Sequence, residues 1–156
     1  MKDIFIDANI ANHFIGLVKV NPHYQNLINW LLTMDEDNPD NNAYLVISNE
    51  LRNEYNRAGN CTHELSIVFI MDKMLRQGRI NPISNSDIKN FCRSCMTKRV
   101  RNSFTSDDQH HIPVVLLSNR KMILSDDTNF ISDLLNFPKL GNSVIAARRP
   151  ENLKYK

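Results

Sequence analysis

Near its start the chain carries the stretch Ile4-Phe5-Ile6-Asp7-Ala8-Asn9, a short apolar run that ends abruptly in a carboxylate. A continuous apolar run of this length predicts a strand buried on both faces, as in a parallel sheet. Asp7 then stands at the carboxyl end of that strand, which is the edge where open α/β sheets place their chemistry. Further carboxylates at matching positions would make this edge a candidate site.

Similar apolar runs further along the chain predict more strands, and segments with helical periodicity lie between them. Alternation of this kind implies an α/β fold in which a central, mostly parallel sheet of four to five strands lies between layers of helices. We expect one domain over residues 1–156, because the chain has no internal repeat or linker. The further runs are residues 43–47, 122–124 and 144–147, with 80–83 short and ambiguous.

Weaker signals give four local expectations. Residues 10–20 carry apolar side chains at helical spacing and predict one helix, whereas residues 98–105 are basic and irregular. Ser106-Asp107-Asp108 could cap a helix that runs to about residue 118, although Pro113 would interrupt it. The polar C-terminal segment, residues 149–156, is expected on the surface.

Composition sets limits on the location and partners of the chain. The formal net charge of +2 is too small to indicate nucleic-acid binding by itself. No apolar stretch reaches the ~20 residues that a membrane span requires. Met1-Lys2-Asp3 leads straight into the first strand, so we expect no signal peptide. Three cysteines, an odd number, suggest reduced thiols and a cytoplasmic setting.

Acidic residues recur where predicted strands end and helices begin. Asp126 and Asp127 follow the run at 122–124, and Asp108 opens a predicted helix. Glu54 lies about two helical turns beyond the run at 43–47, with Glu50 four residues before it on the same helical face. Because the carboxyl ends of parallel strands share one edge, we expect these acids to converge on the carboxylate that ends the first strand.

Carboxylates that share a cleft repel one another unless a hard divalent cation lies between them. Mg²⁺ or Mn²⁺ prefers such oxygen ligands, and it would activate a water and stabilise the leaving oxygen of a phosphodiester. Each acid taken alone has a simpler explanation, as an N-cap or a solvated side chain. Asp7 fits that explanation least, because it follows an apolar run without a strong turn signal.

The segments around these acids resemble the motifs of the PIN domain family, metal-dependent ribonucleases that include many bacterial toxins and RNA-processing endonucleases. The resemblance extends over nearly the whole chain. Its register favours Glu54 over Glu50 and Asp108 over Asp107, and it selects Asp127 in the last acidic motif. The resembling segments are 4–9, 45–55, 106–112 and 121–130, with 144–151 similar to the family's last strand and its exit.

The resemblance implies that Asp7, Glu54, Asp108 and Asp127 hold the metal and carry the catalysis. It departs from the family at His111 and Pro113, where small apolar residues are usual, and at Asn129, where a further Asp often stands. Other residues near the expected cleft are candidates for accessory roles, and basic residues are candidates for RNA contact. The accessory candidates are Asn9, Ser48, Glu50, Asp126, Asn129 and His110, and the basic ones are Lys98, Arg99 and Arg101.

Family likeness also implies RNA as substrate, an antitoxin protein as partner and homodimerisation, none of which any residue shows. Two alternatives remain. The first is a catalytically silent PIN-like scaffold that binds RNA or protein. The second is a receiver-like phosphoacceptor module, which should carry an acidic pair after its first strand and a Lys ending its last strand. Here Asp7 stands alone and Ala147-Arg148 occupies the place of that Lys.

The pair Cys92 and Cys95 has zinc-ligand spacing, and Cys61 and His63 could complete four ligands. No recognisable knuckle pattern surrounds them. The simpler interpretation places the two thiols on one turn of a helix beside Phe91.

Overall fold

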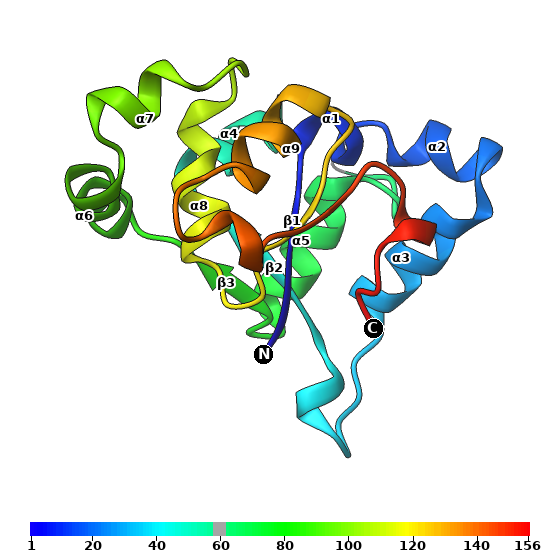
Figure 1. Ribbon diagram of the computed structural model, residues 1–156. Helices are drawn as coiled ribbons and strands as arrows, with labels where there is room; N and C mark the ends of the chain where they lie inside the picture. The colour runs from blue at the N-terminus through cyan, green and yellow to red at the C-terminus, as the bar shows by residue number, and fades with distance from the viewer. Residues whose placement is uncertain (58–61) are drawn as a thin grey trace.

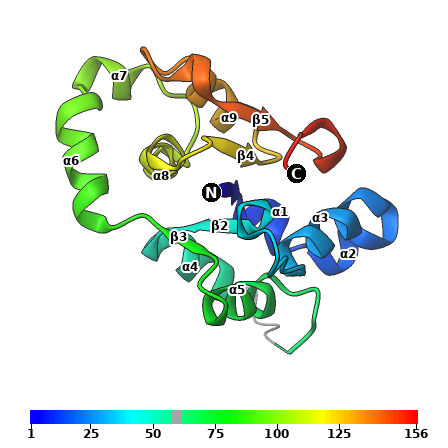
Figure 2. The same ribbon diagram turned by 90° about the horizontal axis from the view of Figure 1, so that it is seen from below.

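The computed structural model describes residues 1–57 and 62–156. Within these residues lies a five-stranded sheet in which every neighbouring pair of strands is parallel, in the order β3-β2-β1-β4-β5. Figure 2 shows the strands in this order. The predicted α/β fold with a parallel sheet of four to five strands is confirmed, and the ambiguous segment at residue 80 is a strand. The strands are β1 (Lys2–Ile6), β2 (Ala43–Ile47), β3 (Ile80–Pro82), β4 (Met122–Leu124) and β5 (Ile145–Ala147).

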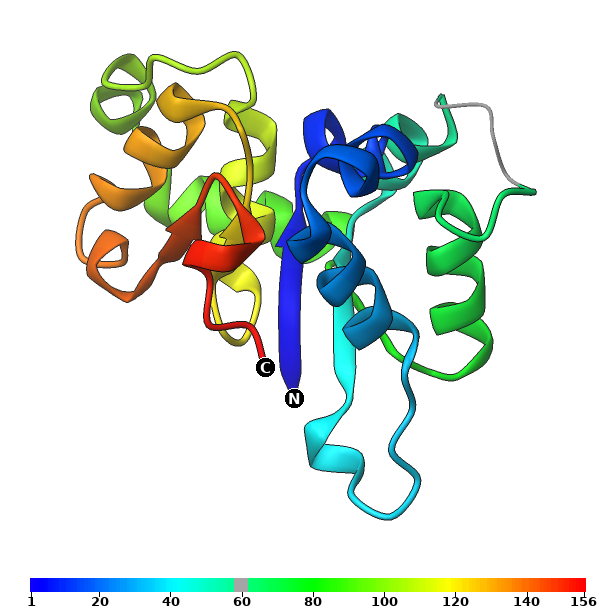
Figure 3. The same ribbon diagram turned by 90° about the vertical axis from the view of Figure 1, so that its right-hand side faces the viewer.

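Helices cover both faces of the sheet, which gives the expected three layers (Figures 1 and 3). One layer contains α1 (Ala8–Ala11), α2 (Phe14–Val20), α3 (Pro22–Leu32), α4 (Asn49–Asn56) and α5 (Ile67–Arg76). The other contains α6 (Asn85–Cys95), α7 (Lys98–Asn102), α8 (Ile112–Leu117) and α9 (Thr128–Leu135). Short 3-10 turns occur at η1 (Pro39–Asn41), η2 (Gln109–His111), η3 (Gly141–Ser143) and η4 (Pro150–Asn152).

Strand β1 occupies the centre of the sheet. Its first half pairs with β2 and its second half with β4, where Phe5 lies beside Ile123 and Ile6 beside Leu124. The chain therefore winds to one side of β1 through β2 and β3, and to the other through β4 and β5. The order reverses between β1 and β4, and open α/β sheets bind ligands at such a switch point. In receiver-like sheets β3 lies next to β1, whereas here it lies next to β2 at an edge.

The apolar run that predicted β1 is buried completely. Ile4, Phe5 and Ile6 are each 0% exposed, because alternate side chains enter the two helical layers. Asp3, at the other end of the strand, is also buried, and its carboxylate accepts hydrogen bonds from the backbone N–H groups of Asn119 and Arg120 at 2.8 Å. Those bonds fix the turn that leads into β4, so both ends of β1 are tied to the β4 side of the sheet.

The segment predicted as one helix over residues 10–20 is two helices, α1 and α2. The break lies at Asn12 and His13, where the Asn12 side chain donates a hydrogen bond to the backbone oxygen of Glu54 at 3.2 Å. The expectation of an irregular segment over 98–105 was also wrong for its first part. Helix α7 forms there because Thr97 caps it, accepting from the N–H of Val100 at 3.3 Å.

The predicted single helix from Asp108 to about residue 118 was wrong as well. The turn η2 comes first and α8 begins only at Ile112, so Pro113 lies in the first turn of α8, where a missing N–H leaves no bond unmade. The C-terminal segment is partly buried rather than wholly on the surface. Leu153 and Tyr155 are buried, and the ring centroid of Tyr155 lies 4.9 Å from that of Trp30.

Among the residues described, none of the helices has both the length and the apolar character needed to cross a membrane.

Candidate metal centre

Asp7 lies at the carboxyl end of β1, buried to 3% exposure. It caps α1 by accepting from the N–H of Asn9 at 3.4 Å, and it accepts the hydroxyl hydrogen of Ser125 at 2.5 Å. Burial raises the pKa of Asp7, and the charges of Glu54 and Asp127 raise it further, against the two hydrogen bonds. A carboxylate in this position is costly to ionise unless positive charge lies close by.

Asp127 follows β4 in the same way that Asp7 follows β1. Its Oδ1 accepts from the N–H of Phe130 at 3.0 Å and so caps α9, as Asp7 caps α1. The Ser125 hydroxyl that donates to Asp7 accepts from the N–H of Asp127 at 3.1 Å. One serine therefore links the carboxylate of Asp7 to the backbone of Asp127, at the ends of the neighbouring strands β1 and β4.

Asp108 is brought to the same edge by the loop before η2. The hydroxyl of Ser106 accepts from the N–H of Asp108 at 3.0 Å and donates to Oδ2 of Asp127 at 3.2 Å. Burial raises the pKa of Asp108, and the charges of Asp7 and Asp127 add to that effect. The second serine thus links the backbone of Asp108 to the carboxylate of Asp127.

A buried acid outside the cluster holds this loop in place. Both carboxylate oxygens of Asp133, on α9, accept from the N–H of Thr105 at 3.0 Å, and Oδ2 also accepts from the N–H of Ser106 at 2.8 Å. Asp133 is 6% exposed and makes these bonds inward, toward the loop. The position of Asp108 therefore depends on α9.

Glu54 approaches from α4 and is held by two histidines. Its Oε1 lies 3.1 Å from Nε2 of His110, and its Oε2 lies 2.9 Å from Nε2 of His111. Burial alone would raise the pKa of Glu54, but the hydrogen bonds and charges of His111 and His110 outweigh it, and the pKa is lowered. The Tyr55 hydroxyl donates to the backbone oxygen of Ile6, which fixes α4 beside the end of β1.

Three of the four acids line one hollow of about 320 Å³. It is lined by Asp7, Ala8, Asn9, Asn12, His13, Glu54, Arg57 and Asp108. Asp127 does not line it and joins the cluster through Ser106 and Ser125. Asp7, Glu54 and Asp108 therefore share one hollow, and among the described residues no three of the four predicted carboxylates lie within 4.8 Å of one another.

The accessory candidates divide between this hollow and others. Asn9 lines it, and its side-chain oxygen accepts from the N–H of Asp126 at 3.4 Å. The Asp126 carboxylate points elsewhere, into a larger hollow, and pairs with Arg148 at 2.6 Å. Asn129 is exposed on α9. The remaining three, Ser48, Glu50 and His110, line a third hollow of about 300 Å³ together with Asn85 and Ile88.

The basic candidates Lys98, Arg99 and Arg101 are exposed on α7. Figure 1 shows α7 to one side of the sheet end at which α1, α4 and α9 gather. The Arg101 side chain also donates to the backbone oxygen of Met96 at 3.0 Å, so it fixes α7 to the end of α6. These cations do not line the hollow that holds the acids.

Cys92 and Cys95 are free thiols, partly buried and packed against the core. The Cys92 thiol contacts the sulfur of Met96 at 3.6 Å. Among the described residues, the His, Cys, Asp and Glu side chains that could hold an ion within 4.8 Å of one another are Glu54, His110 and His111. His63 is not among them, and Cys61 lies outside the described residues.

The donor set fits a hard divalent cation. Beyond the effect of burial, the charge of Asp7 raises the pKa of Asp108, and the charge of Glu54 raises the pKa of Asp7. Burial is the largest cause of both shifts and the like charges add to it, while all three acids line the same hollow. Carboxylate oxygens are the ligands that Mg²⁺ and Mn²⁺ prefer, and a cation here would offset that repulsion. The imidazoles beside Glu54 add nitrogen donors, which Mn²⁺ accepts more readily than Mg²⁺ does.

Sequence reasoning missed the residues that support the acids. His111 entered it only as a departure from a motif, although its ring is 0% exposed and partners Glu54. Ser106 and Ser125 each stand directly before a pair of aspartates. That adjacency was the signal in the sequence that could have identified them. Asp133 gave no signal, because its partners lie 27 and 28 residues earlier in the chain.

Comparisons with protein-family models, with curated proteins and with solved structures find no match to this chain.

Proposed function

We propose that this chain is a PIN-like, Mg²⁺- or Mn²⁺-dependent endoribonuclease that acts in the cytoplasm. The observation that supports the proposal is that Asp7, Glu54 and Asp108 line one hollow at the carboxyl edge of a parallel sheet, beside its switch point, with Asp127 hydrogen-bonded to it through Ser106 and Ser125. Three of these acids come from separate parts of the chain and line one open hollow. A site built from like charges in this way serves cation binding better than it serves stability.

In this proposal Asp7, Asp108 and Glu54 hold the cation from the hollow, and Asp127 supports it from behind. When bound, the cation supplies an activated water and stabilises the leaving oxygen of the phosphodiester. Ser125 and Ser106 keep the carboxylates oriented through their hydroxyl groups. The histidines keep Glu54 ionised, because they lower its pKa.

The hollow also carries positive charge for an anionic substrate. Arg57 and His13 line it together with the acids, so a phosphate next to the scissile bond would meet a guanidinium and an imidazole. The basic helix α7 lies to one side of the sheet end at which α1, α4 and α9 gather, and it would offer further contacts to an RNA backbone. The choice of RNA as substrate rests on the resemblance to PIN domains, as do the antitoxin partner and the homodimer.

A ribonuclease assay tests this proposal. The chain is incubated with a panel of labelled RNAs in Mn²⁺ or Mg²⁺, beside Asp7→Asn and the matched control Asp107→Asn. Asp107 is an exposed carboxylate next to the cluster and outside it. We expect cleavage by wild type and by Asp107→Asn, none by Asp7→Asn, and none in EDTA. Equal cleavage by all three would indicate a contaminant, and no cleavage by wild type would favour the silent scaffold.

A further inference from the structure

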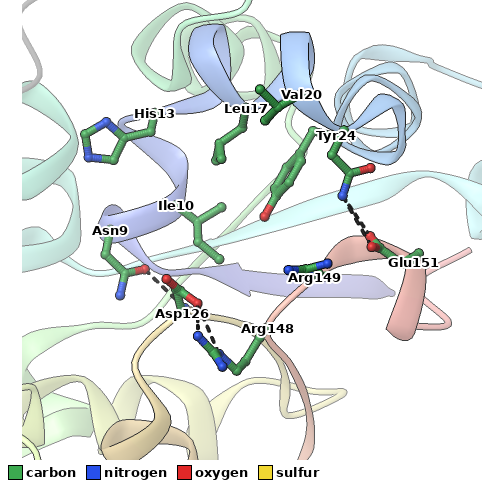
Figure 4. A pocket seen from close by; sticks show the side chains of 11 residues that line it. Asn9, Ile10, His13, Leu17, Val20, Tyr24, Asp126, Arg148, Arg149 and Glu151 are labelled. Carbon is green, nitrogen blue, oxygen red and sulfur yellow. Dashed lines mark hydrogen bonds and ion pairs between the residues drawn. The ribbon is translucent and has the colours of Figure 1, made fainter.

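A second, larger hollow adjoins the one that holds the acids. Its volume is about 600 Å³, within the range of small-ligand sites, and Asn9 and His13 line both hollows. Figure 4 shows it between α1, α2 and α3 on one side and the segments that follow β4 and β5 on the other. We propose that it binds a single nucleotide of the RNA strand, next to the phosphodiester at the acidic hollow. This inference rests on the proposed function.

The two walls of this hollow differ in character. The wall from α1 to α3 carries an apolar stripe with the ring of Tyr24, and amide and imidazole groups lie beside it. The facing wall carries carboxylates and guanidinium groups. A nucleobase needs both, since its faces pack on apolar or aromatic groups and its edge forms hydrogen bonds. The apolar stripe consists of Ile10, Leu17, Val20 and Tyr24, with Asn9, His13 and Asn21 on the same wall, and the facing wall consists of Asp126, Arg148, Arg149 and Glu151.

Most polar groups of the second wall already have partners. Arg148 donates to Oδ1 of Asp126 from Nη2 at 2.6 Å and from Nε at 3.0 Å, so these two charges cancel. Glu151 accepts from the side-chain amide of Asn21 at 3.2 and 3.3 Å. Each pair holds its two side chains in place, and their remaining donors and acceptors are available to the edge of a base. Glu151 keeps its negative charge, and Arg149 is the guanidinium of this hollow that makes no ion pair within 4.0 Å among the described residues.

Arg149 differs from its neighbour. Among residues 1–57 and 62–156 its guanidinium donates to no carboxylate, and in Figure 4 it points toward the same space as the Tyr24 hydroxyl. One guanidinium that no carboxylate binds directly suits one phosphate group. Together, one cation and one amphiphilic slot match one nucleotide better than they match an extended anion.

The orientation of a bound strand follows from the continuity of this hollow with the one lined by Asp7, Glu54 and Asp108. A ligand that spans both hollows must place a cleavable phosphate beside the carboxylates and a base beyond Asn9 and His13. A single nucleic-acid strand has this spacing built in, because each base is joined to the next phosphate through its own sugar. The hollow would then select the nucleotide next to the scissile bond.

The test measures RNA binding apart from cleavage. Labelled single-stranded tetranucleotides are titrated in EDTA against the full chain carrying Asp7→Asn, which cannot cut and lacks one repulsive charge. Arg149→Gln is added to this background and compared with Lys73→Gln, the same change of charge on an exposed residue of α5. We expect Arg149→Gln to weaken binding roughly tenfold or more, since it removes a charge-assisted hydrogen bond.

The salt dependence separates a phosphate contact from a structural effect. The slope of log affinity against log salt should fall by about 0.7 in Arg149→Gln and stay unchanged in Lys73→Gln, because the protein then neutralises one phosphate fewer on a single strand. Equal affinities and slopes in the two variants would overturn the inference, as would a failure of every tetranucleotide to bind. A protein ligand in place of RNA would give that second result.

The two proposals fail separately. If binding depends on Arg149 but the wild-type chain cuts no RNA, the nucleotide site stands and the nuclease proposal falls. If wild type cuts RNA and Arg149→Gln cuts the same substrates with unchanged kcat/KM, the nuclease stands and the nucleotide site falls.

Discussion

Oε2 of Glu54 lies 2.9 Å from Nε2 of His111, whose ring is completely buried and packs against Phe5 and Phe130. The other ring nitrogen of His111 has no hydrogen-bond partner among the described residues. The ring therefore serves Glu54 alone. It joins α8 to α4 across the end of β1, and it sets the charge state of the acid that reaches the cluster from the far side.

Replacing His111 should change the pH dependence of metal binding. In His111→Phe the pKa of Glu54 should rise, because burial raises it and the larger of the two histidine contributions that together outweigh burial is removed. Protons then compete with the cation at higher pH, so the midpoint for loss of Mn²⁺ affinity on acidification should move upward. Calorimetric titration with Mn²⁺ over a range of pH measures it. His23→Phe, on an exposed histidine of α3, is the control, and an unchanged midpoint in His111→Phe would contradict the role of His111.

Neutralising Asp7 should stabilise the chain when no cation is present. Folding raises the pKa of Asp7 above its usual value of about 3.8, so the folded state holds that proton more tightly than the unfolded state does. The tighter hold on this proton stabilises the folded state fully below the usual pKa of Asp7. That stabilisation is lost as the pH rises through the raised pKa of the folded state. At neutral pH in EDTA, Asp7→Asn should therefore unfold at a higher temperature than wild type, and the difference should shrink toward acid pH.

Thermal unfolding at acid and neutral pH, followed by circular dichroism, measures this difference. Adding Mn²⁺ should raise the unfolding temperature of wild type more than that of the variant. A cation stabilises the folded state in proportion to how tightly it binds, and the variant lacks one of the proposed ligands. If Asp7→Asn is destabilised equally at both pH values, the carboxylate is a structural cap and not a strained ligand.

Removing the Ser106 hydroxyl should weaken the site without unfolding the chain. In Ser106→Ala, Asp127 loses a donor and the N–H of Asp108 loses its acceptor. Outer partners of metal ligands are worth roughly 10–100-fold in affinity or activity, so Mn²⁺ affinity and kcat/KM should both fall by about that factor. Asp133→Asn should act in the same direction, because it loosens the loop that carries Ser106.

Ser143→Ala is the matched control for this prediction. The Ser143 hydroxyl donates to the backbone oxygen of Leu140 at 2.7 Å, on the surface and away from the acids. Its removal should leave Mn²⁺ affinity within twofold of wild type. Equal affinities in Ser106→Ala and Ser143→Ala would show that the hydroxyl link does not orient the carboxylates.

The basic surface of α7 should contribute to RNA binding and not to metal binding. In the double variant Lys98→Gln, Arg99→Gln, the salt slope of RNA affinity should fall by about 0.7 for each phosphate that the side chains no longer neutralise, with Mn²⁺ affinity unchanged. The control is Lys73→Gln with Arg76→Gln on α5, where Arg76 pairs with Asp72 at the surface. If both double variants bind RNA with the same slope, α7 is a solvated surface helix.

Much of the fold follows from local sequence signals. The runs that predicted β1, β2 and β4 are buried on both faces. A short run with apolar side chains on both faces must be covered on both sides, as in the interior of a parallel sheet. Asp7 at the end of the first run therefore fell where expected. The order of the strands did not follow, because an alternation of strands and helices is compatible with more than one arrangement around the first strand.

What the sequence did not show depends on distant partners. The break between α1 and α2 is fixed by a bond from Asn12 to a backbone oxygen 42 residues away. The clamp of Asp133 on Ser106 and the pairing of His111 with Glu54 likewise join segments with no shared local pattern. Periodicity and capping signals report on neighbours within a turn or two, so contacts of this kind appear only in the folded chain.

The central claim is that Asp7, Glu54, Asp108 and Asp127 form one divalent-cation site. Titration of the full chain with Mn²⁺, with free ion measured by electron paramagnetic resonance, tests it most directly. Wild type and Asp107→Asn should bind Mn²⁺ with the same affinity, and Asp7→Asn and Glu54→Gln should each lose at least tenfold while circular dichroism shows an intact fold. Equal Mn²⁺ binding by all four proteins, or none by wild type, would contradict the claim.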